Sequence, residues 1–134
     1  MKAISLFSNC GAGDIGFQDA GFTFNVMAEL IEHRLDICLL NHLEAKGVPG
    51  DLRETWLEVV NLYRSTTNDA PLSLLAACPP CQGMSTARND RGMEEDPDAG
   101  SRDYRNLLVV VIAQVAKALL PSIIVVENVP AFLT

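Results

Sequence analysis

The chain has 134 residues and a mass of 14.5 kDa, a length that favours a single domain. Its composition, 49% hydrophobic and 20% charged, is typical of a folded domain and excludes a disordered one. The net charge of −7 disfavours a protein that holds nucleic acid unaided, because neutralising phosphates requires basic residues. Four irregularly spaced cysteines, no secretory signal and no bilayer-length apolar run lead us to expect a soluble protein of the cytoplasm.

Short apolar runs alternate with segments in which apolar residues recur at helical spacing. In the first half we expect a strand at residues 3–7, a helix from a glycine-rich turn to about residue 20, a strand at 24–28, a helix at 32–43 and a break at 48–50. In the second half we expect a helix around 56–63, a loop at 65–70, a buried strand at 72–77, a polar lid or disordered segment at 82–102, a largely buried helix at 107–120 and a buried strand at 123–127. This alternation predicts a doubly wound, mostly parallel α/β sheet.

Residues able to do chemistry follow the expected strands, where ligands of open α/β sheets bind. The first group is the turn from Ser8 to Gly16, which contains the pattern Gly-x-Gly-x-x-Gly beginning at Gly11. Such a turn lets the backbone approach a cofactor closely, although a tight turn without a ligand produces the same pattern. Glu29, after the second strand, is either a ribose-binding carboxylate or a solvated one.

The segment from Cys78 to Gln82 reads Cys-Pro-Pro-Cys-Gln and permits three interpretations. Half of a zinc site is the weakest of them, because His33 and His42 are not suitably spaced to complete it. A redox-active pair of Cys78 and Cys81, and a loop that presents Cys81 as a nucleophile, are equally compatible with the spacing.

Glu127 and Asn128 follow the last expected strand. A glutamate whose surroundings keep it protonated can act as an acid near neutral pH, whereas a solvated glutamate at the start of a loop cannot. The local sequence leaves both interpretations open.

In this order, the groups resemble the DNA cytosine-5 methyltransferase family. The matching elements, which cover nearly the whole chain, are Leu6-Phe7-Ser8 with Gly11 and Gly16, Glu29, Gly50-Asp51-Leu52, Pro79-Pro80-Cys81-Gln82-Gly83-Met84-Ser85, Arg105-Asn106-Leu107 and Glu127-Asn128-Val129. The chain departs from the family where aspartate is common, at Ser5 and Ile31, and where glycine is usual, at Asn9, Ala12 and Cys78.

The resemblance implies a Rossmann-like, S-adenosylmethionine-dependent methyltransferase fold that ends after its fifth strand. Residues 1–134 would then be the part that binds the cofactor and carries the nucleophile, without the domain that reads DNA. S-adenosyl-L-methionine would bind with Glu29 at its ribose hydroxyls, Asp51 at its adenine amino group and Leu107 as an apolar contact. The implied cofactor-binding residues are Phe7, Ser8, Asn9, Cys10, Gly11, Gly13, Asp14, Ile15, Gly16, Glu29, Leu30, Asp51, Leu52, Pro79 and Leu107.

The resemblance also implies a reaction at carbon 5 of cytosine. Cys81 would add to C6, Glu127 would supply a proton at N3, and Asn128 would hold the Cys81 loop. The target base must leave the duplex to be reached, and the polar segment at 83–102 would close over it. The implied substrate-binding residues are Pro80, Gln82, Gly83 and Ser85.

We expect double-stranded DNA as a partner, contacted through a C-terminal part or complementing subunit that the 134 residues lack. The chain would then be a fragment or split subunit of a restriction–modification enzyme, inactive alone, in the bacterial cytoplasm or on the nucleoid. Residues 123–126 would form an apolar sheet edge prone to self-association. Alternatives are a tRNA cytosine-5 methyltransferase, a non-catalytic cofactor-binding subunit and an oxidoreductase that forms a Cys78–Cys81 disulfide.

Overall fold

The computed structural model describes residues 1–80 and 108–128. In these residues five strands form one sheet in the order β3-β2-β1-β4-β5, and every pairing is parallel. The strands are β1 (Lys2–Leu6), β2 (Thr23–Glu29), β3 (Lys46–Pro49), β4 (Leu74–Ala77) and β5 (Ile123–Val126). The helical elements are a 3-10 turn, η1 (Ala12–Asp14), and the helices α1 (Ile15–Asp19), α2 (Glu32–Asn41), α3 (Leu52–Thr67) and α4 (Leu108–Leu119).

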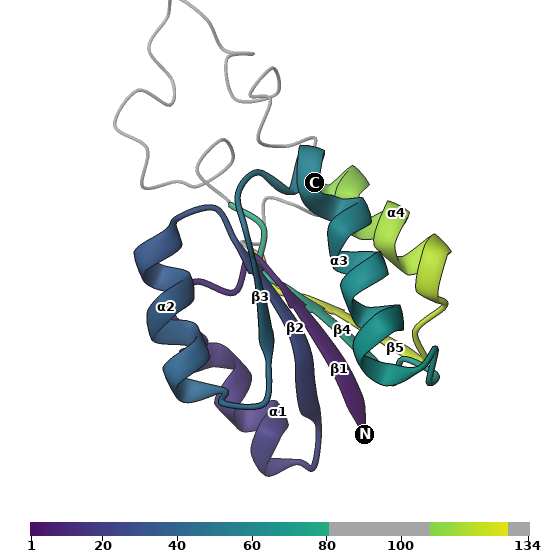
Figure 1. Cartoon of the computed structure of the whole chain (residues 1–134), viewed down its shortest axis with the longest axis horizontal. Helices are drawn as coiled ribbons and strands as arrows, with labels where there is room; N and C mark the ends of the chain where they lie inside the picture. Colours follow the sequence, from purple (N-terminus) through teal and green to yellow (C-terminus); the bar gives the residue numbers. More distant parts are fainter. Residues whose placement is uncertain (81–107, 129–134) are drawn as a thin grey trace, which may run out of the picture.

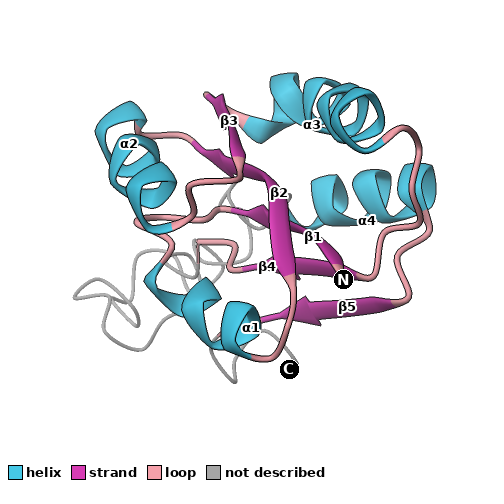
Figure 2. Cartoon of the chain, turned by 60° about the horizontal axis from the view of Figure 1, so that its bottom comes forward, coloured by secondary structure: helices cyan, strands magenta, loops and turns pink. Residues whose placement is uncertain are grey.

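The sheet lies between two layers of helices, with α1 and α2 on one face and α3 and α4 on the other (Figures 1 and 2). Strand β1 is buried on both faces from Ala3 to Leu6. Ile4 and Leu6 pack in the core beneath α3 and α4, whereas Ala3 packs in a second core with Leu35 and Cys38 of α2. A parallel strand buried on both faces needs apolar residues at successive positions. The predicted doubly wound sheet is therefore confirmed.

Strand β1 is the point at which the chain changes direction. It pairs with β2 on one side and with β4 on the other. The segment after β1 leads toward β2 on one side, and the segment after β4 leads toward β5 on the other. The two segments diverge at the carboxyl ends of β1 and β4, which opens a crevice there. None of the described helices is long and apolar enough to cross a membrane.

The break predicted at residues 48–50 is wrong, because Lys46–Pro49 form β3 and pair with β2. This strand is short and contains Gly47 and Pro49, so it lacks a β pattern. A Cβ atom at Gly47 would lie 2.9 Å from Leu39 Cδ1 and 3.0 Å from Leu35 Cδ2, so a larger residue there would require these leucine side chains to shift. Pro49 is tolerated because β3 is the last strand on this side of the described sheet, where a missing N–H costs little.

The loop predicted to start at Ser65 is also wrong, because α3 continues to Thr67. Hydroxyl groups near its end donate to carbonyls one turn earlier: Thr66 to Leu62 O at 2.7 Å and Thr67 to Tyr63 O at 2.7 Å. Polar residues that usually favour loops can remain helical when they make this bond.

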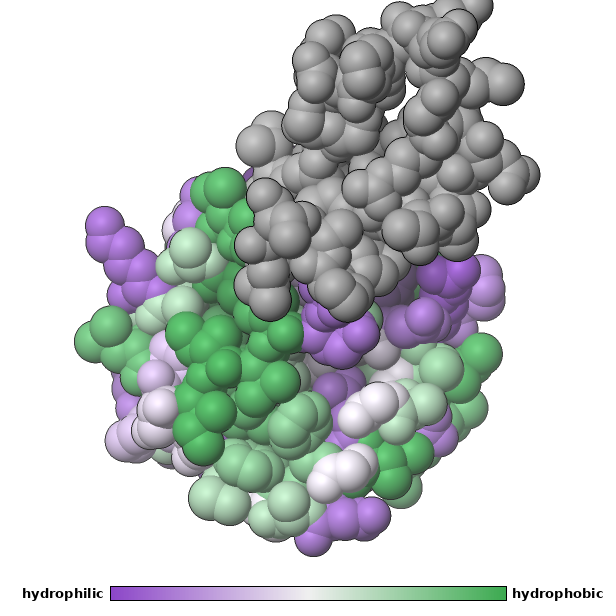
Figure 3. Space-filling view, turned by 180° about the vertical axis from the view of Figure 1, so that it is seen from behind, coloured by the Kyte–Doolittle hydropathy of each residue, from purple (hydrophilic) through white to green (hydrophobic). Residues whose placement is uncertain are grey.

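The last two elements are less buried than their apolar sequences predict. In α4 the buried side chains lie on one side of the helix, and Val110 is 50% exposed. In β5, Ile123 and Ile124 are each 49% exposed. Strand β5 pairs with β4, and no other described strand pairs with it. The expected apolar sheet edge is therefore present in the described part, and Figure 3, which views this side, shows an apolar patch there.

Candidate functional site

A cavity of about 710 Å³ lies at the carboxyl ends of β1 and β2 and at the beginning of α3. Ser5 and Phe7 line it from the end of β1, Glu29 from the end of β2, and Leu52 from α3. Volumes of this size are typical of small-molecule sites. The cavity is at the crevice that the change of direction at β1 creates.

The turn after β1 enters the cavity through two unusual backbone conformations. Phe7 has φ of 58° and Asn9 has φ of 51°, a left-handed region that non-glycine residues rarely adopt. Between them, Ser8 N donates to Ala28 O at 3.0 Å, and Ser8 Oγ accepts from Ala28 N at 3.1 Å. These bonds to β2 hold the strained turn, so that Phe7 and Asn9 both line the cavity.

Gly11 serves the packing of this turn. It has φ of +75°, and a Cβ atom there would lie 2.7 Å from His42 Cδ2 and 2.9 Å from Cys38 Sγ. His42 is buried, and its Nε2 donates to Gly11 O at 2.9 Å. Gly13 differs from Gly11, because it lines the cavity and a Cβ atom there would meet nothing within 4 Å.

Glu29 is buried at 7% exposure, so the interpretation as a solvated carboxylate is wrong. Its Oε2 accepts from Asn9 N at 2.9 Å and its Oε1 accepts from Ile31 N at 3.1 Å. Each carboxylate oxygen has two lone pairs. Glu29 therefore fixes the turn and keeps acceptor capacity on the cavity wall.

Asp14 is a second buried carboxylate on this wall. Ser5 Oγ donates to its Oδ2 at 2.7 Å, and both residues line the cavity. Burial raises the pKa of Asp14 from its usual value, while the Ser5 hydrogen bond and the charge of His42 oppose that increase.

Asp51 and Arg53 form a charged pair at the beginning of α3. Asp51 is the N-cap, and its Oδ1 accepts from Arg53 N at 2.9 Å. Arg53 Nε lies 3.0 Å from both carboxylate oxygens, and its terminal nitrogen also contacts Oδ2. The Arg53 hydrogen bond lowers the pKa of Asp51. Sequence reasoning missed Arg53. The signal that could have identified it is its position two residues after Asp51, an acidic residue at the start of a helix.

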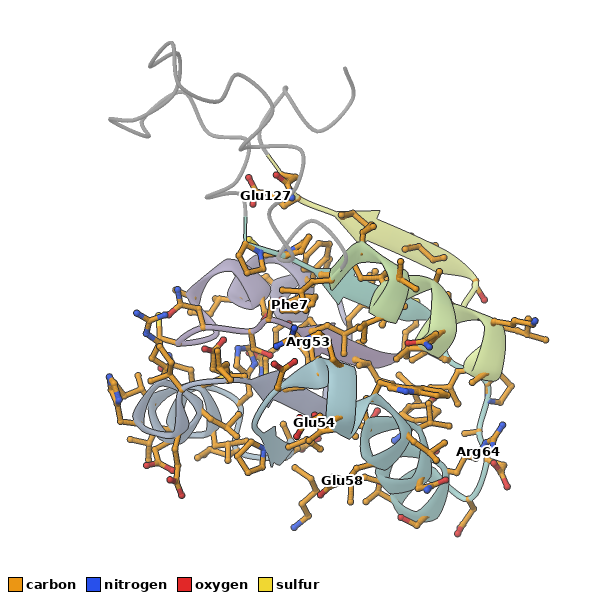
Figure 4. The ribbon with its side chains drawn as sticks, turned by 90° about the horizontal axis from the view of Figure 1, so that it is seen from above. Phe7, Arg53, Glu54, Glu58, Arg64 and Glu127 are labelled. Carbon is orange, nitrogen blue, oxygen red and sulfur yellow. The ribbon has the colours of Figure 1, made fainter. Side chains whose placement is uncertain are left out.

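The ends of β4 and β5 are joined beside the cavity, which Cys78 lines. Cys78 Sγ donates to Glu127 Oε2 at 2.9 Å, and Asn128 Nδ2 donates to Pro79 O at 3.4 Å. Figure 4 shows Glu127 beyond Phe7, at the end of β5. The Glu127 side chain is exposed in the described structure, whereas the local sequence leaves both a solvated and a protonated glutamate open.

The predicted residues fall into three groups. Those that line the cavity are Phe7, Ser8, Asn9, Cys10, Gly13, Asp14, Glu29, Leu30, Asp51, Leu52 and Pro80. Those that the structure describes away from its lining are Gly11, Ile15, Gly16, Pro79, Glu127 and Asn128. Those that lie outside the described residues are Cys81, Gln82, Gly83, Ser85 and Leu107. Lining residues that sequence reasoning missed include Arg34, Arg53 and Leu108, and Cys78, which the sequence suggests only as a member of a redox pair or of a zinc site, also lines the cavity.

The family model described as C-5 cytosine-specific DNA methylase matches residues 1–134. The type II methyltransferase M1.HgaI of Avibacterium volantium is 36% identical over 133 residues, which are 99% of this chain and 36% of that protein. The type II methyltransferase M.AquIA of Picosynechococcus sp. is 34% identical over 128 residues, which are 96% of this chain and 48% of that protein. The chain thus spans about a third to a half of these relatives.

Two solved structures share the fold. A prophage-encoded protein of E. coli, assigned as a DNA modification methyltransferase, superposes with a TM-score of 0.76 and 25% identity, over 100% of this chain and 33% of that one. An Aeromonas hydrophila protein, assigned to the short-chain dehydrogenase/reductase family, superposes with a TM-score of 0.53 and 21% identity, over 95% of this chain and 58% of that one. The second likeness shows the fold alone.

The contrast between the two turn glycines can be measured. Gly11→Ala should lower the free energy of unfolding by about 1–3 kcal/mol, because it adds a strained φ and a clash with His42. Gly13→Ala is the matched control and should change it by less than about 0.5 kcal/mol. Chemical denaturation of the two variants tests this, and equal losses would contradict the assigned roles.

The buried Asp14 should make stability depend on pH. Because its folded-state pKa is raised, the folded protein holds this proton more tightly, and the ionised group costs stability above that pKa. Asp14→Asn should therefore raise the free energy of unfolding most at neutral pH, by a margin that shrinks as the pH falls through the folded-state pKa of Asp14. Denaturation of both proteins at several pH values measures the margin, and a margin independent of pH would contradict the argument.

Proposed function

We propose a function from one premise: the chain belongs to the family of C-5 cytosine-specific DNA methylases. The proposal is that it carries the methyl-donor site and the nucleophile of an enzyme that methylates carbon 5 of cytosine in DNA. The family match over residues 1–134 carries this proposal. The names of the relatives, type II methyltransferases, support a role in restriction–modification.

The lining of the cavity supports a place for the ribose of S-adenosylmethionine beside Glu29. Glu29 uses one lone pair on each oxygen for Asn9 N and Ile31 N. The remaining lone pairs suit two neighbouring hydroxyl groups, which the ribose supplies. The side chains of Leu30 and Leu52 provide apolar walls beside it, as small-molecule sites usually require.

The methionine end of the cofactor would lie along the turn after β1. Gly13 lines the cavity, and the space where its Cβ would be is open. A close approach of a ligand to the backbone needs that space. The expected contact between Asp51 and the adenine amino group fits less well, because Arg53 already engages both carboxylate oxygens. Arg53 would have to move for Asp51 to accept from adenine.

The bound cofactor would supply the methyl group, and the residues of this chain would activate the cytosine. The Cys81 thiolate would form a bond to C6, and the electron pair gained at C5 would take the methyl group. Glu127 would offer a proton at N3 as charge develops on the ring. Loss of the C5 proton to water would then restore the C5–C6 double bond and release the Cys81 thiolate, and the N3 proton would return to Glu127. Cys81 lies outside the described residues, and we place it by its position after Pro80.

Asn128 would support the nucleophile indirectly. Its side chain donates to Pro79 O at 3.4 Å, two residues before Cys81. Holding this backbone limits the positions that the following loop can take. Precise placement of a nucleophile lowers the activation barrier substantially.

DNA would be held mainly by protein outside this chain. A net charge of −7 gives little attraction to phosphates. The matched segment covers only 36% of M1.HgaI and 48% of M.AquIA. Strand β5 presents an apolar edge that pairs with no other described strand besides β4. We propose that a further segment or a complementing subunit covers this edge, and that the chain self-associates there when alone.

Glu29 provides a test of the cofactor site in the chain itself. Glu29→Ala should weaken binding of S-adenosylmethionine and S-adenosylhomocysteine by about 1–3 kcal/mol, because the ribose hydroxyls lose their acceptor. Glu58→Ala, an exposed carboxylate of α3 shown in Figure 4, is the control and should bind normally. Calorimetry measures both. Tight binding of NAD, with no response to either methionine compound, would favour a dinucleotide domain instead.

The reaction itself can be tested with Cys81. The purified chain should transfer no tritiated methyl groups to cytosine-containing DNA alone, and should do so with a C-terminal complement that supplies the part of the relatives outside the match. Cys81→Ser should abolish transfer and leave cofactor affinity nearly unchanged, since a hydroxyl is a far weaker nucleophile.

DNA that carries 5-fluorocytosine should trap a covalent adduct that requires Cys81. An adduct lost in Cys78→Ala and kept in Cys81→Ala would reverse the assignment of the nucleophile. Turnover by the chain alone would show that no complement is needed.

A further inference from the structure

The ends of β4 and β5 are held in register by the backbone. Ala77 pairs with Val126, and Glu127 N donates to Ala77 O at 2.9 Å. One residue further along, Cys78 N donates to Leu6 O at 3.2 Å, which ties the other side of this segment to β1. Cys78 is thus fixed between two strands at the crevice, with Glu127 beside it.

The Cys78 side chain contacts Glu127 directly. Its Sγ donates to Glu127 Oε2 at 2.9 Å. Both side chains are exposed, so burial does not force this contact. A glutamate side chain at the end of an edge strand has several rotamers open to it, and a hydrogen bond to a fixed neighbour selects among them.

We infer that Cys78 is a positioning residue for Glu127, and that its thiol holds the carboxylate beside Cys78, which lines the cavity. The inference rests on the proposed function, because it matters to catalysis only if Glu127 acts on the base. Cys78 does not itself form a bond to the substrate. It restricts Glu127, so its loss should lower the rate of the chemical step and leave cofactor binding unchanged.

The contact can be tested first without any activity. Alkylation by iodoacetamide requires the thiolate, and a carboxylate beside Cys78 disfavours a second negative charge. Glu127→Gln removes that charge, so alkylation of Cys78, followed by mass spectrometry of its peptide in a Cys81→Ser background, should become at least about threefold faster. An unchanged rate would overturn the inference.

Two other cysteines are controls in the same experiment. Cys10 is partly exposed, and its alkylation rate should be the same in both proteins. Cys38 is 0% exposed, and burial raises its pKa to about 12. Its lack of reaction in both proteins shows that the substitution leaves the fold intact.

The effect on catalysis is tested with two variants of the complemented protein. Cys78→Ala should lower kcat by about three- to tenfold with the KM for S-adenosylmethionine unchanged, because a hydrogen bond that orients Glu127 is lost. Cys78→Ser restores a donor and should recover most of the rate, which a packing role would not explain.

The outcomes separate this inference from the proposed function. Equal kcat values for the wild type and Cys78→Ala, in a protein that methylates cytosine, would overturn the positioning role and leave the function standing. No methyl transfer by the complemented wild type would overturn the function and the inference with it.

Discussion

The parallel pairing of β1 on both sides is the constraint on which the rest of the structure depends. Because β2 lies on one side and β4 on the other, the chain must leave β1 in two directions and the helices must cover both faces. That arrangement buries Ala3 to Leu6 of β1 and opens the crevice at its carboxyl end. The cavity, the strained turn and the Cys78–Glu127 contact all lie at that end because the topology puts them there.

Much of the fold could be predicted from its longest apolar patterns. The strands at β1, β2 and β4 and the helices α2 to α4 are recognisable because burial on one or both faces imposes a regular spacing. The missed strand β3 is four residues long and contains Gly47 and Pro49, and its pairing with β2 outweighs these local signals. The exposure of the β5 side chains could not be predicted from its sequence. It depends on what packs against the strand, and β4 is the one described strand that pairs with it.

The sequence predicts where the site residues lie better than it predicts which residues they contact. Strand ends indicate where Glu29 and Cys78 lie, but not that Asn9 N would bind Glu29 or that Arg53 would engage Asp51. Such contacts depend on backbone turns and rotamers that local sequence does not encode. Ser5 is a telling case. The family commonly has an aspartate there, and here Ser5 donates to Asp14 at 2.7 Å, so a carboxylate still lies beside the end of β1.

The two halves of the site are held by different means. The half where we propose that the cofactor binds is anchored in the core, because Ser8 forms hydrogen bonds with Ala28 of β2 and Gly11 packs against the buried His42. The half that contains Glu127 is at the end of β5, whose side chains are largely exposed. Among the described residues, the side chains of Glu127 and Asn128 contact the segment after β4 through hydrogen bonds with Cys78 Sγ and Pro79 O. A hydrogen bond from the Cys78 thiol restricts an exposed side chain such as Glu127 more than it would a buried one, because packing in a core already limits the rotamers of a side chain.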